Sequence, residues 1–303
     1  MFEERERLVE DISRLRRERN AVIVAHNYQT GEVQDVADFV GDSLELSQKA
    51  AGWEARTIVF CGVHFMAETA AILAPEKTVL LPDREAGCPM ADMITAADLR
   101  QWKAKYPGRP VVCYVNTTAE VKAESDVCCT SSNAERVVNS LPPGEVLFVP
   151  DKNLAAWVAR RTGRKIIAWD GYCYVHHRFR AADIADKKAR HPEAEVWAHP
   201  ECPLEVLDVA DKVLSTGGMV REARATSCRE VILATEAGII HRLKKENPAV
   251  EYFPAREMAF CTNMKKITLV KVLRSLETGT ERITVPAAIA ERARGAIARM
   301  LEI

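Results

Sequence analysis

A threefold internal repeat constrains the fold of this chain more than any other feature of its sequence. The clearest marker is an apolar run that ends in polar residues, and it occurs three times, at 22–28, 111–116 and 196–201. When these runs are placed in register, His26, Tyr114 and His199 take the same position, which sets the offset between successive copies. Such a regular spacing predicts one structural unit present in three copies.

Two further markers keep this spacing. Hydroxyl-bearing turns place Ser43, Ser131 and Thr216 at the same two offsets as His26, Tyr114 and His199. A cysteine follows the last apolar run of each repeat, and these cysteines, Cys88, Cys173 and Cys261, are spaced almost identically. We therefore interpret the three cysteines as copies of one position.

Short apolar strands alternate with helical patterns, which predicts an α/β fold with parallel sheets and helices on both faces. We expect three similar α/β/α domains around a central cleft, at 1–87 with 281–303, at 88–173 and at 174–280. The polar markers fall at the carboxyl ends of the strands, where such sheets bind ligands. The last stretch, 285–303, is predicted to be a helix that packs on the first repeat beside the N-terminal helix.

The composition excludes several classes of protein. A net charge of −1 gives no indication of nucleic acid or of an anionic membrane surface as a partner. The first twenty residues are densely charged, unlike a signal peptide, and no stretch approaches the length of an apolar membrane span. We expect a cytoplasmic protein, in which the nine cysteines serve as core residues or metal ligands rather than in disulfides.

The three repeated cysteines are candidate ligands of a single metal cluster. A lone cysteine is most often a small buried hydrophobic residue, and we interpret Cys61 and Cys113 in this way. Three thiolates are one short of a closed zinc site and one short of a fully ligated [4Fe–4S] cluster, so one iron would keep an open position. Cys202 is the one other cysteine that we consider as an alternative ligand. Cys128 and Cys129 are adjacent, and for them we favour the absence of a redox role over its presence.

Polar side chains at the strand ends suggest acid–base chemistry. His26 with Tyr28, and His199 with Glu201, lie two residues apart and so share a face of their strand. Such pairs can donate and accept protons near neutral pH. We interpret one of His176 and His177 as a support for Cys173 rather than as a ligand. The three hydroxyl turns could each be a simple helix cap, but three in register favour a substrate with several anionic groups.

The sequence also carries a series of motifs in a fixed order, listed here as AHNYQ, GDS, GCPMADM, YVNTTAEVKA, CTSSNA, PDKNLA, WDGYCYVHH, AHPEC, STGGM and FCTNMKKIT. Together these motifs resemble the quinolinate synthase family of the NadA type over nearly the whole chain. Some members carry a CxxCxxC stretch near the last cysteine, whereas this chain has only Cys261 there and resembles the shorter form.

This resemblance implies one oxygen-labile [4Fe–4S] cluster held by Cys88, Cys173 and Cys261. It implies the condensation of iminoaspartate with dihydroxyacetone phosphate to give quinolinate in NAD biosynthesis, and it makes the oxidase that supplies the imine a candidate transient partner. By the same resemblance, Tyr28, Tyr114, His199 and Glu201 are catalytic candidates. The implied substrate-binding residues are His26, Ser43, Tyr114, Val115, Asn116, Ser131, His199, Pro200, Glu201 and Thr216.

Two other enzyme classes share the plan of three domains around a cluster. Radical enzymes of diphthamide synthesis and the terminal reductase of isoprenoid synthesis have one cysteine per domain, but the AHNYQ, HPE and STGG elements are not known from them. A non-catalytic protein that senses oxygen or iron through a cluster is the alternative from another class. A sensor of this kind would not require His26, Tyr28 and Glu201 to occupy matching positions in the repeats.

Overall fold

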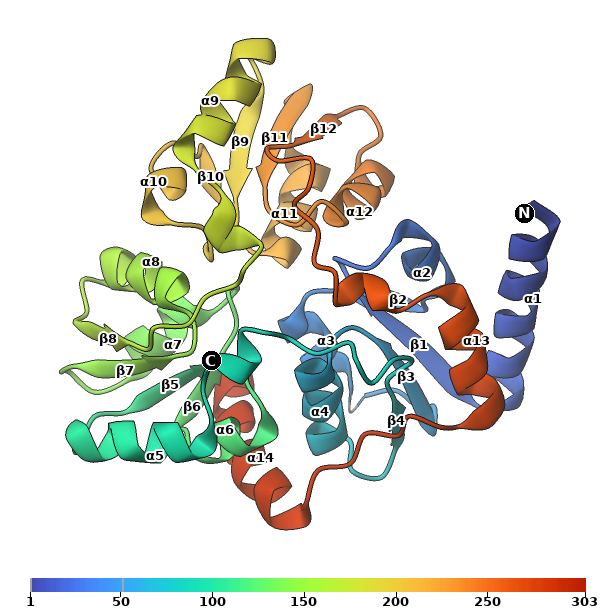
Figure 1. Cartoon of the computed structure of the whole chain (residues 1–303), viewed down its shortest axis with the longest axis horizontal. Coiled ribbons are helices and arrows are strands. Elements are labelled where there is room, and N and C mark those ends of the chain that lie inside the picture. Colours follow the sequence, from blue (N-terminus) through green and yellow to red (C-terminus); the bar gives the residue numbers. More distant parts are fainter. Residues whose placement is uncertain (1, 51) are drawn as a thin grey trace.

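The computed structural model describes residues 2–50 and 52–303, which form three four-stranded sheets arranged around a common centre (Figure 1). The first sheet and its helices comprise α1 (Phe2–Glu18), β1 (Ala21–His26), α2 (Gly31–Val36), β2 (Phe39–Gly41), α3 (Ser43–Ala50), β3 (Thr57–Cys61), α4 (His64–Leu73) and β4 (Thr78–Leu80). The second comprises η1 (Ala91–Met93), α5 (Ala96–Lys105), β5 (Val111–Tyr114), α6 (Ala119–Ala123), β6 (Val127–Cys129), α7 (Ala134–Ser140), β7 (Val146–Val149), α8 (Lys152–Thr162) and β8 (Ile166–Ala168).

The third sheet is built in the same way, and two helices follow it. Its elements are η2 (His176–Arg178), α9 (Ala181–Arg190), β9 (Glu195–Ala198), α10 (Leu204–Leu207), β10 (Lys212–Val213), α11 (Thr216–Ala225), β11 (Glu230–Ala234), α12 (Ile239–Glu246) and β12 (Glu251–Pro254). The chain then continues through η3 (Met264–Lys266), α13 (Leu269–Thr278) and α14 (Ala287–Glu302).

All three sheets have one topology. Their strand orders are β2-β1-β3-β4, β6-β5-β7-β8 and β10-β9-β11-β12, and the strands within each sheet pair in parallel. The predicted α/β class with three similar units is therefore confirmed. The domain limits at 87, 173 and 280 stay a prediction.

The segment that carries each cysteine is also repeated. A 3₁₀ turn begins three residues after each cysteine, and a ten-residue helix begins eight residues after it: α5 after Cys88, α9 after Cys173 and α13 after Cys261. Figure 1 shows these connections leaving one unit and crossing near the centre of the molecule toward the next. Each cysteine therefore lies on the connection from one unit to the next.

An aspartate fastens the first two strands of every sheet, although the sequence patterns did not draw attention to it. The carboxylates of Asp38, Asp126 and Asp211 accept the backbone N–H of Ile23, Val111 and Val196 at 2.8, 2.7 and 2.8 Å. The three aspartates keep the same two offsets as the hydroxyl turns. The bond fixes the chain just before each second strand, and so fixes the direction in which the strand ends point.

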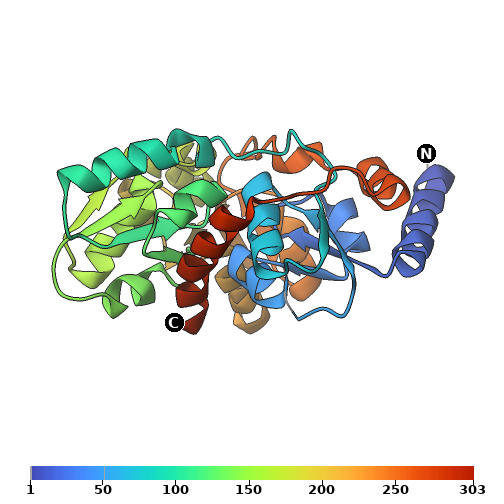
Figure 2. The ribbon, with the colours of Figure 1, turned by 90° about the horizontal axis from the view of Figure 1, so that it is seen from below.

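The last helix does not pack where the sequence led us to expect it. We predicted that 285–303 would lie on the first repeat beside the N-terminal helix, but α14 packs mainly on α6 and β6 of the second sheet and only partly on α4 (Figures 1 and 2). Instead, α13 packs against α1 and β3. Because α13 already covers this part of the first sheet, the buried face of α14, with Ala293, Ala296, Ile297 and Met300, covers the second.

Among the helices of residues 2–50 and 52–303, none has both the length and the apolar character that crossing a membrane would require.

The repeated aspartate generates a first prediction. Replacing Asp211 by Ala should destabilise the apoprotein by about 1–2 kcal/mol, because the N–H of Val196 loses a charged acceptor. For a chain of this size we expect the melting temperature to fall by about 2–6 °C. Thermal unfolding followed by circular dichroism measures the change. The matched control is Asp186→Ala on the exposed side of α9, and equal melting temperatures for the two variants would contradict the assigned role of Asp211.

Candidate active site

One cavity lies where the carboxyl ends of the three sets of strands converge, and it contains about 760 Å³ of empty space, part of it open to solvent. Most of the residues predicted from the sequence line it: His26, Tyr28, Ser43, Cys88, Tyr114, Asn116, Ser131, Cys173, His199, Glu201, Thr216 and Cys261. Val115 and Pro200 are buried but do not line this cavity. The structure thus brings together residues from all three repeats.

The three repeated cysteines differ from the other cysteines in their surroundings. Cys88, Cys173 and Cys261 are half-buried, free thiols that line the same cavity. Cys202, the alternative ligand, is fully buried, does not line the cavity, and lies with its sulfur 3.3 Å from the carbonyl oxygen of Ala234. A fully buried thiol in this position acts as a core residue. Cys61, Cys113, Cys128 and Cys129 are likewise fully buried.

Burial raises the pKa of each of the three cavity thiols, that of Cys88 to about 12. Repulsion between the cysteines adds to this effect, since Cys88 and Cys261 both raise the pKa of Cys173. Three such groups cannot all ionise without a cation between them, and a bound metal stabilises the thiolate. The cavity therefore has the donor set of a metal site.

Within the described residues, the one tight group of candidate metal ligands is Cys173, His176 and Glu201, whose ligand atoms lie within 4.8 Å of one another. Cys88 and Cys261 are not part of this group. In a cluster of several irons each cysteine binds a different iron, so the sulfurs lie farther apart than around one ion. The tight group would suit a single ion, whereas a cluster does not require its three cysteines to lie so close together.

Glu201 is the centre of a buried hydrogen-bond network. Its Oε1 accepts a hydrogen bond from the Tyr114 hydroxyl at 2.5 Å, and its Oε2 lies 2.7 Å from His176 Nδ1. On the other side of the imidazole, His176 Nε2 lies 3.0 Å from the Thr235 hydroxyl, which in turn lies 2.6 Å from the Tyr28 hydroxyl. A continuous path of hydrogen bonds thus joins Tyr28 to Glu201.

The pKa values of these groups are pushed in opposite directions. Burial raises the pKa of Tyr28 and of Tyr114 well above the usual value, and the nearby Glu201 carboxylate raises both further. Burial alone would raise the pKa of Glu201, but its contacts with His176, His199 and Tyr114 outweigh burial and lower it. Groups whose pKa values diverge in this way are suited to act as an acid and a base in one site.

Sequence reasoning missed two members of this network. One of His176 and His177 was expected to support Cys173, and His176 Nδ1 does lie 3.3 Å from the Cys173 sulfur. Its contact with Glu201 and its stacking on the ring of His199, with centroids 4.5 Å apart, were not expected. Thr235, at the end of β11, was not considered at all. The motif WDGYCYVHH pointed to a histidine near Cys173, but it contains both His176 and His177. Only the fold distinguishes them, because His177 Nδ1 lies 3.1 Å from the Asn153 side-chain amide, outside the network.

The hydroxyl turns are not simple helix caps. The preceding residue caps the helix in two repeats: Asp42 accepts the N–H of Glu45 at 2.9 Å, and Ser215 accepts that of Gly218 at 3.1 Å. Ser43 and Thr216 therefore open their helices with side chains that line the cavity, and no described residue is hydrogen-bonded to either hydroxyl. These hydroxyls can thus serve a ligand.

Asp42 also links the three repeats. The Ser132 hydroxyl lies 2.7 Å from Asp42 Oδ2 and 2.8 Å from the Ser215 hydroxyl, so one residue from each repeat contributes to a single chain of hydrogen bonds. A side chain at position 217 would collide with Asp42, because a Cβ there would lie 2.4 Å from its Oδ2. The link holds the three helix starts at the floor of the cavity.

Comparisons with known proteins identify the family of this chain. Residues 10–302 match the family model NadA, described as quinolinate synthetase A protein. The chain belongs to the NadA family. It is 58% identical over 292 residues to the quinolinate synthase of Dehalococcoides mccartyi strain 195, covering 96% of this chain and 97% of that protein. It is 57% identical over 296 residues to that of Methanoregula boonei, covering 98% of each chain.

Because the relatives of this NadA protein are named as quinolinate synthases, the family and the enzyme class expected from the motifs are confirmed. The roles of the individual side chains stay predictions.

His26 provides a prediction on pH dependence. Burial lowers the pKa of His26 to about 4, so the ring is neutral in the folded protein, and Nδ1 accepts the N–H of Tyr28 at 3.2 Å. In the unfolded chain a histidine titrates near 6.5, so between about pH 6.5 and 4 the unfolded state binds more protons. The unfolding free energy should therefore fall on acidification, by up to about 1.4 kcal/mol per pH unit from this residue.

The measurement is an NMR titration of labelled histidine in the apoprotein, together with urea unfolding at several pH values. The His26 resonance should not titrate between pH 8 and 5, and His26→Asn, which keeps an acceptor for the Tyr28 N–H, should reduce the pH dependence of stability. A His26 ring that titrates near pH 6.5 would show that the site is more hydrated than the structure indicates.

Proposed function

We propose that this chain condenses iminoaspartate with dihydroxyacetone phosphate to form quinolinate, with release of one phosphate and two waters. The balance closes, since C₄H₅NO₄ and C₃H₇O₆P together give C₇H₅NO₄, H₃PO₄ and two H₂O. The observation that carries the proposal is that the three repeated cysteines and the Tyr28–Glu201 network line one cavity. The family match supports the reaction that we propose for this cavity.

Cys88, Cys173 and Cys261 would hold a [4Fe–4S] cluster by one thiolate from each repeat. All three line one cavity, and a cluster in which each cysteine binds a different iron would use one from each repeat. Because burial raises their pKa values, binding would release protons from the thiols. When bound, such a cluster supplies a Lewis-acidic iron with a free coordination position, which eases the loss of a hydroxyl group as water. The oxygen sensitivity of the enzyme is part of the same proposal.

The protein's own residues would move the protons that dehydration requires. Glu201 is ionised and can take a proton, whereas Tyr28 stays protonated and can donate one. His176 lies between the two ends of the path, with Nδ1 2.7 Å from Glu201 Oε2 and Nε2 3.0 Å from the Thr235 hydroxyl. If Glu201 takes a proton from the substrate and Tyr28 gives one to the departing hydroxyl, the path through His176 and Thr235 would return a proton from Glu201 to Tyr28 and reset both residues.

Substrate binding would depend on the hydroxyls of the repeated turns. Iminoaspartate brings two carboxylates and dihydroxyacetone phosphate brings a phosphate, which gives three anionic groups. Ser43, Ser131 and Thr216 offer one hydroxyl from each repeat to the cavity. The side-chain oxygen of Asn116 is buried without a partner among the described residues, and it can accept from a substrate hydroxyl or imine.

The setting of the reaction is part of the proposal as well. The imine substrate is unstable in water, so the oxidase that forms it is the proposed transient partner, and the cytoplasm, where NAD is made, is the proposed location.

The first test is loss of a cysteine ligand. Anaerobically purified protein should contain about four irons and four sulfides per chain and should form quinolinate when given both substrates. Cys173→Ser should lose the cluster absorbance and the activity together, because the cavity keeps only two thiolates. Cys228→Ser, a half-buried cysteine that does not line the cavity, is the matched control. One iron per chain without sulfide would instead support a single ion at Cys173, His176 and Glu201.

The second test separates the base from the ligands. Glu201→Gln keeps the size of the side chain and an acceptor for Tyr114 but cannot take a proton. Its iron content should match that of the parent protein, and its kcat should fall by about 10²–10⁴-fold, the usual contribution of a general base. Glu205→Gln, exposed on α10, serves as control. If Glu201→Gln lost iron in proportion to activity, Glu201 would be a metal ligand and not a base.

A further inference from the structure

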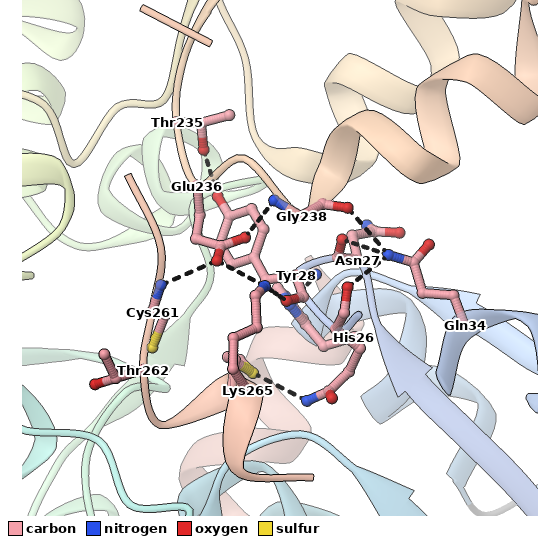
Figure 3. A network of polar contacts seen from close by, with 12 residues as sticks. His26, Asn27, Tyr28, Gln34, Thr235, Glu236, Gly238, Cys261, Thr262 and Lys265 are labelled. Carbon is pink, nitrogen blue, oxygen red and sulfur yellow. Dashed lines mark hydrogen bonds and ion pairs between the residues drawn. The ribbon is translucent and has the colours of Figure 1, made fainter. Parts of the chain in front are cut away.

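Glu236 and Lys265 form an ion pair in the third unit that also contacts the first unit at Tyr28, and neither the sequence nor the proposed reaction required it (Figure 3). Glu236 Oε1 accepts the backbone N–H of Cys261 at 2.9 Å, and Oε2 accepts that of Gly238 at 2.7 Å. Lys265 Nζ lies 2.7 Å from Glu236 Oε1 and also donates to the backbone carbonyl of Tyr28. One ion pair therefore touches both the Cys261 segment and the strand end that carries Tyr28.

The repeat supports a specific task for Glu236. Asp151 takes the equivalent position in the second unit, where it likewise follows the third strand. Its Oδ2 accepts the backbone N–H of Cys173 at 3.2 Å, as Glu236 does for Cys261. In the first unit this position is Val63, whose side chain has no acceptor. Two of the three cysteine segments are thus held by a carboxylate from the edge of their own sheet.

Burial makes the lysine necessary to the arrangement. The Glu236 side chain is 1% exposed, and an ionised carboxylate at that depth requires a cation or several donors. Lys265 supplies the charge, and its own side chain is 22% exposed. Lys266, its neighbour in η3, turns outward to the carbonyl of Glu85 at 2.9 Å. The two lysines are adjacent in the sequence but face different ways. Lys265 contacts Glu236 and Tyr28, whereas Lys266 contacts Glu85.

The Tyr28 strand end is held from the other side as well. Gln34 Nε2 donates to the carbonyls of Asn27 and Gln29 at 3.2 and 2.9 Å, and to that of Gly238 at 3.1 Å. Three successive carbonyls after β1 are therefore occupied by Gln34 and Lys265. Gly238 packs directly on the ion pair, since a Cβ there would lie 2.5 Å from Lys265 Nζ and 2.9 Å from the Tyr28 carbonyl oxygen.

We propose that Glu236 and Lys265 are positioning residues that fix Cys261 relative to Tyr28. This inference rests on the proposed function in that it takes Cys261 as a ligand of the cluster and Tyr28 as the acid. Glu236 holds the amide of the ligand, Lys265 holds the backbone of the acid, and the bond between them sets the separation of the two. Neither side chain exchanges protons with the substrate in this role.

The test begins with the apoprotein, where neither cluster nor turnover affects the result. Hydrogen exchange of a peptide that spans 257–264 should be about tenfold faster or more in Lys265→Met, because the charged acceptor of the Cys261 amide loses its partner. Gly238→Ala keeps both charges but separates them, and it should change the exchange in the same direction. Lys265→Arg should restore most of the protection. Lys266→Met is the matched control and should exchange like the parent.

The reconstituted enzyme provides a second measurement. In Lys265→Met the cluster absorbance should decay about tenfold faster in the presence of an iron chelator, since one ligand segment opens more often. The kcat should fall while KM changes by less than about threefold, because substrate groups are untouched. Parent-like exchange and parent-like cluster loss in Lys265→Met would overturn the inference. A parent protein that forms no quinolinate would overturn the proposed function instead, and the exchange experiment would still decide the role of the pair.

Discussion

The structure depends on one constraint, which is that parallel strands place all their carboxyl ends at a single edge. In one sheet this edge gives a shallow crevice. Three sheets of identical strand order, turned so that their edges face one another, enclose a cavity in which no unit has a complete site. The position of every functional side chain follows from that convergence, so contacts that fix strand ends matter more here than the size of any one core.

Electrostatics in the cavity follow from the same enclosure. A carboxylate as buried as Glu201 is costly unless donors surround it, and Tyr114 and His176 provide them. Burial also raises the pKa values of Tyr28 and Tyr114, so both hydroxyls stay protonated beside this carboxylate. His176 and Thr235 therefore join the acid and the base within the cavity.

The sequence was sufficient for features that repeat and insufficient for contacts between repeats. The constant offsets between copies identified the sheets, the cysteines and the hydroxyl turns, because each recurs with its own local pattern. Thr235 and Lys265 carry no such pattern, and each contacts Tyr28 from another unit, so only the fold reveals them. The place of α14 was mispredicted for a similar reason: periodicity shows which face of a helix is apolar, but the competing helix α13 decides which sheet that face covers.

The repeats have diverged where chemistry, rather than folding, is at stake. Asp38, Asp126 and Asp211 are unchanged because each fastens its own sheet. At the position beside the cysteine, by contrast, the first unit has Val63. Burial raises the pKa of Asp151 in the second unit well above the usual value, whereas Glu236 in the third is paired with a lysine. Three different side chains at equivalent places give a threefold scaffold an asymmetric site, as two unlike substrates would require.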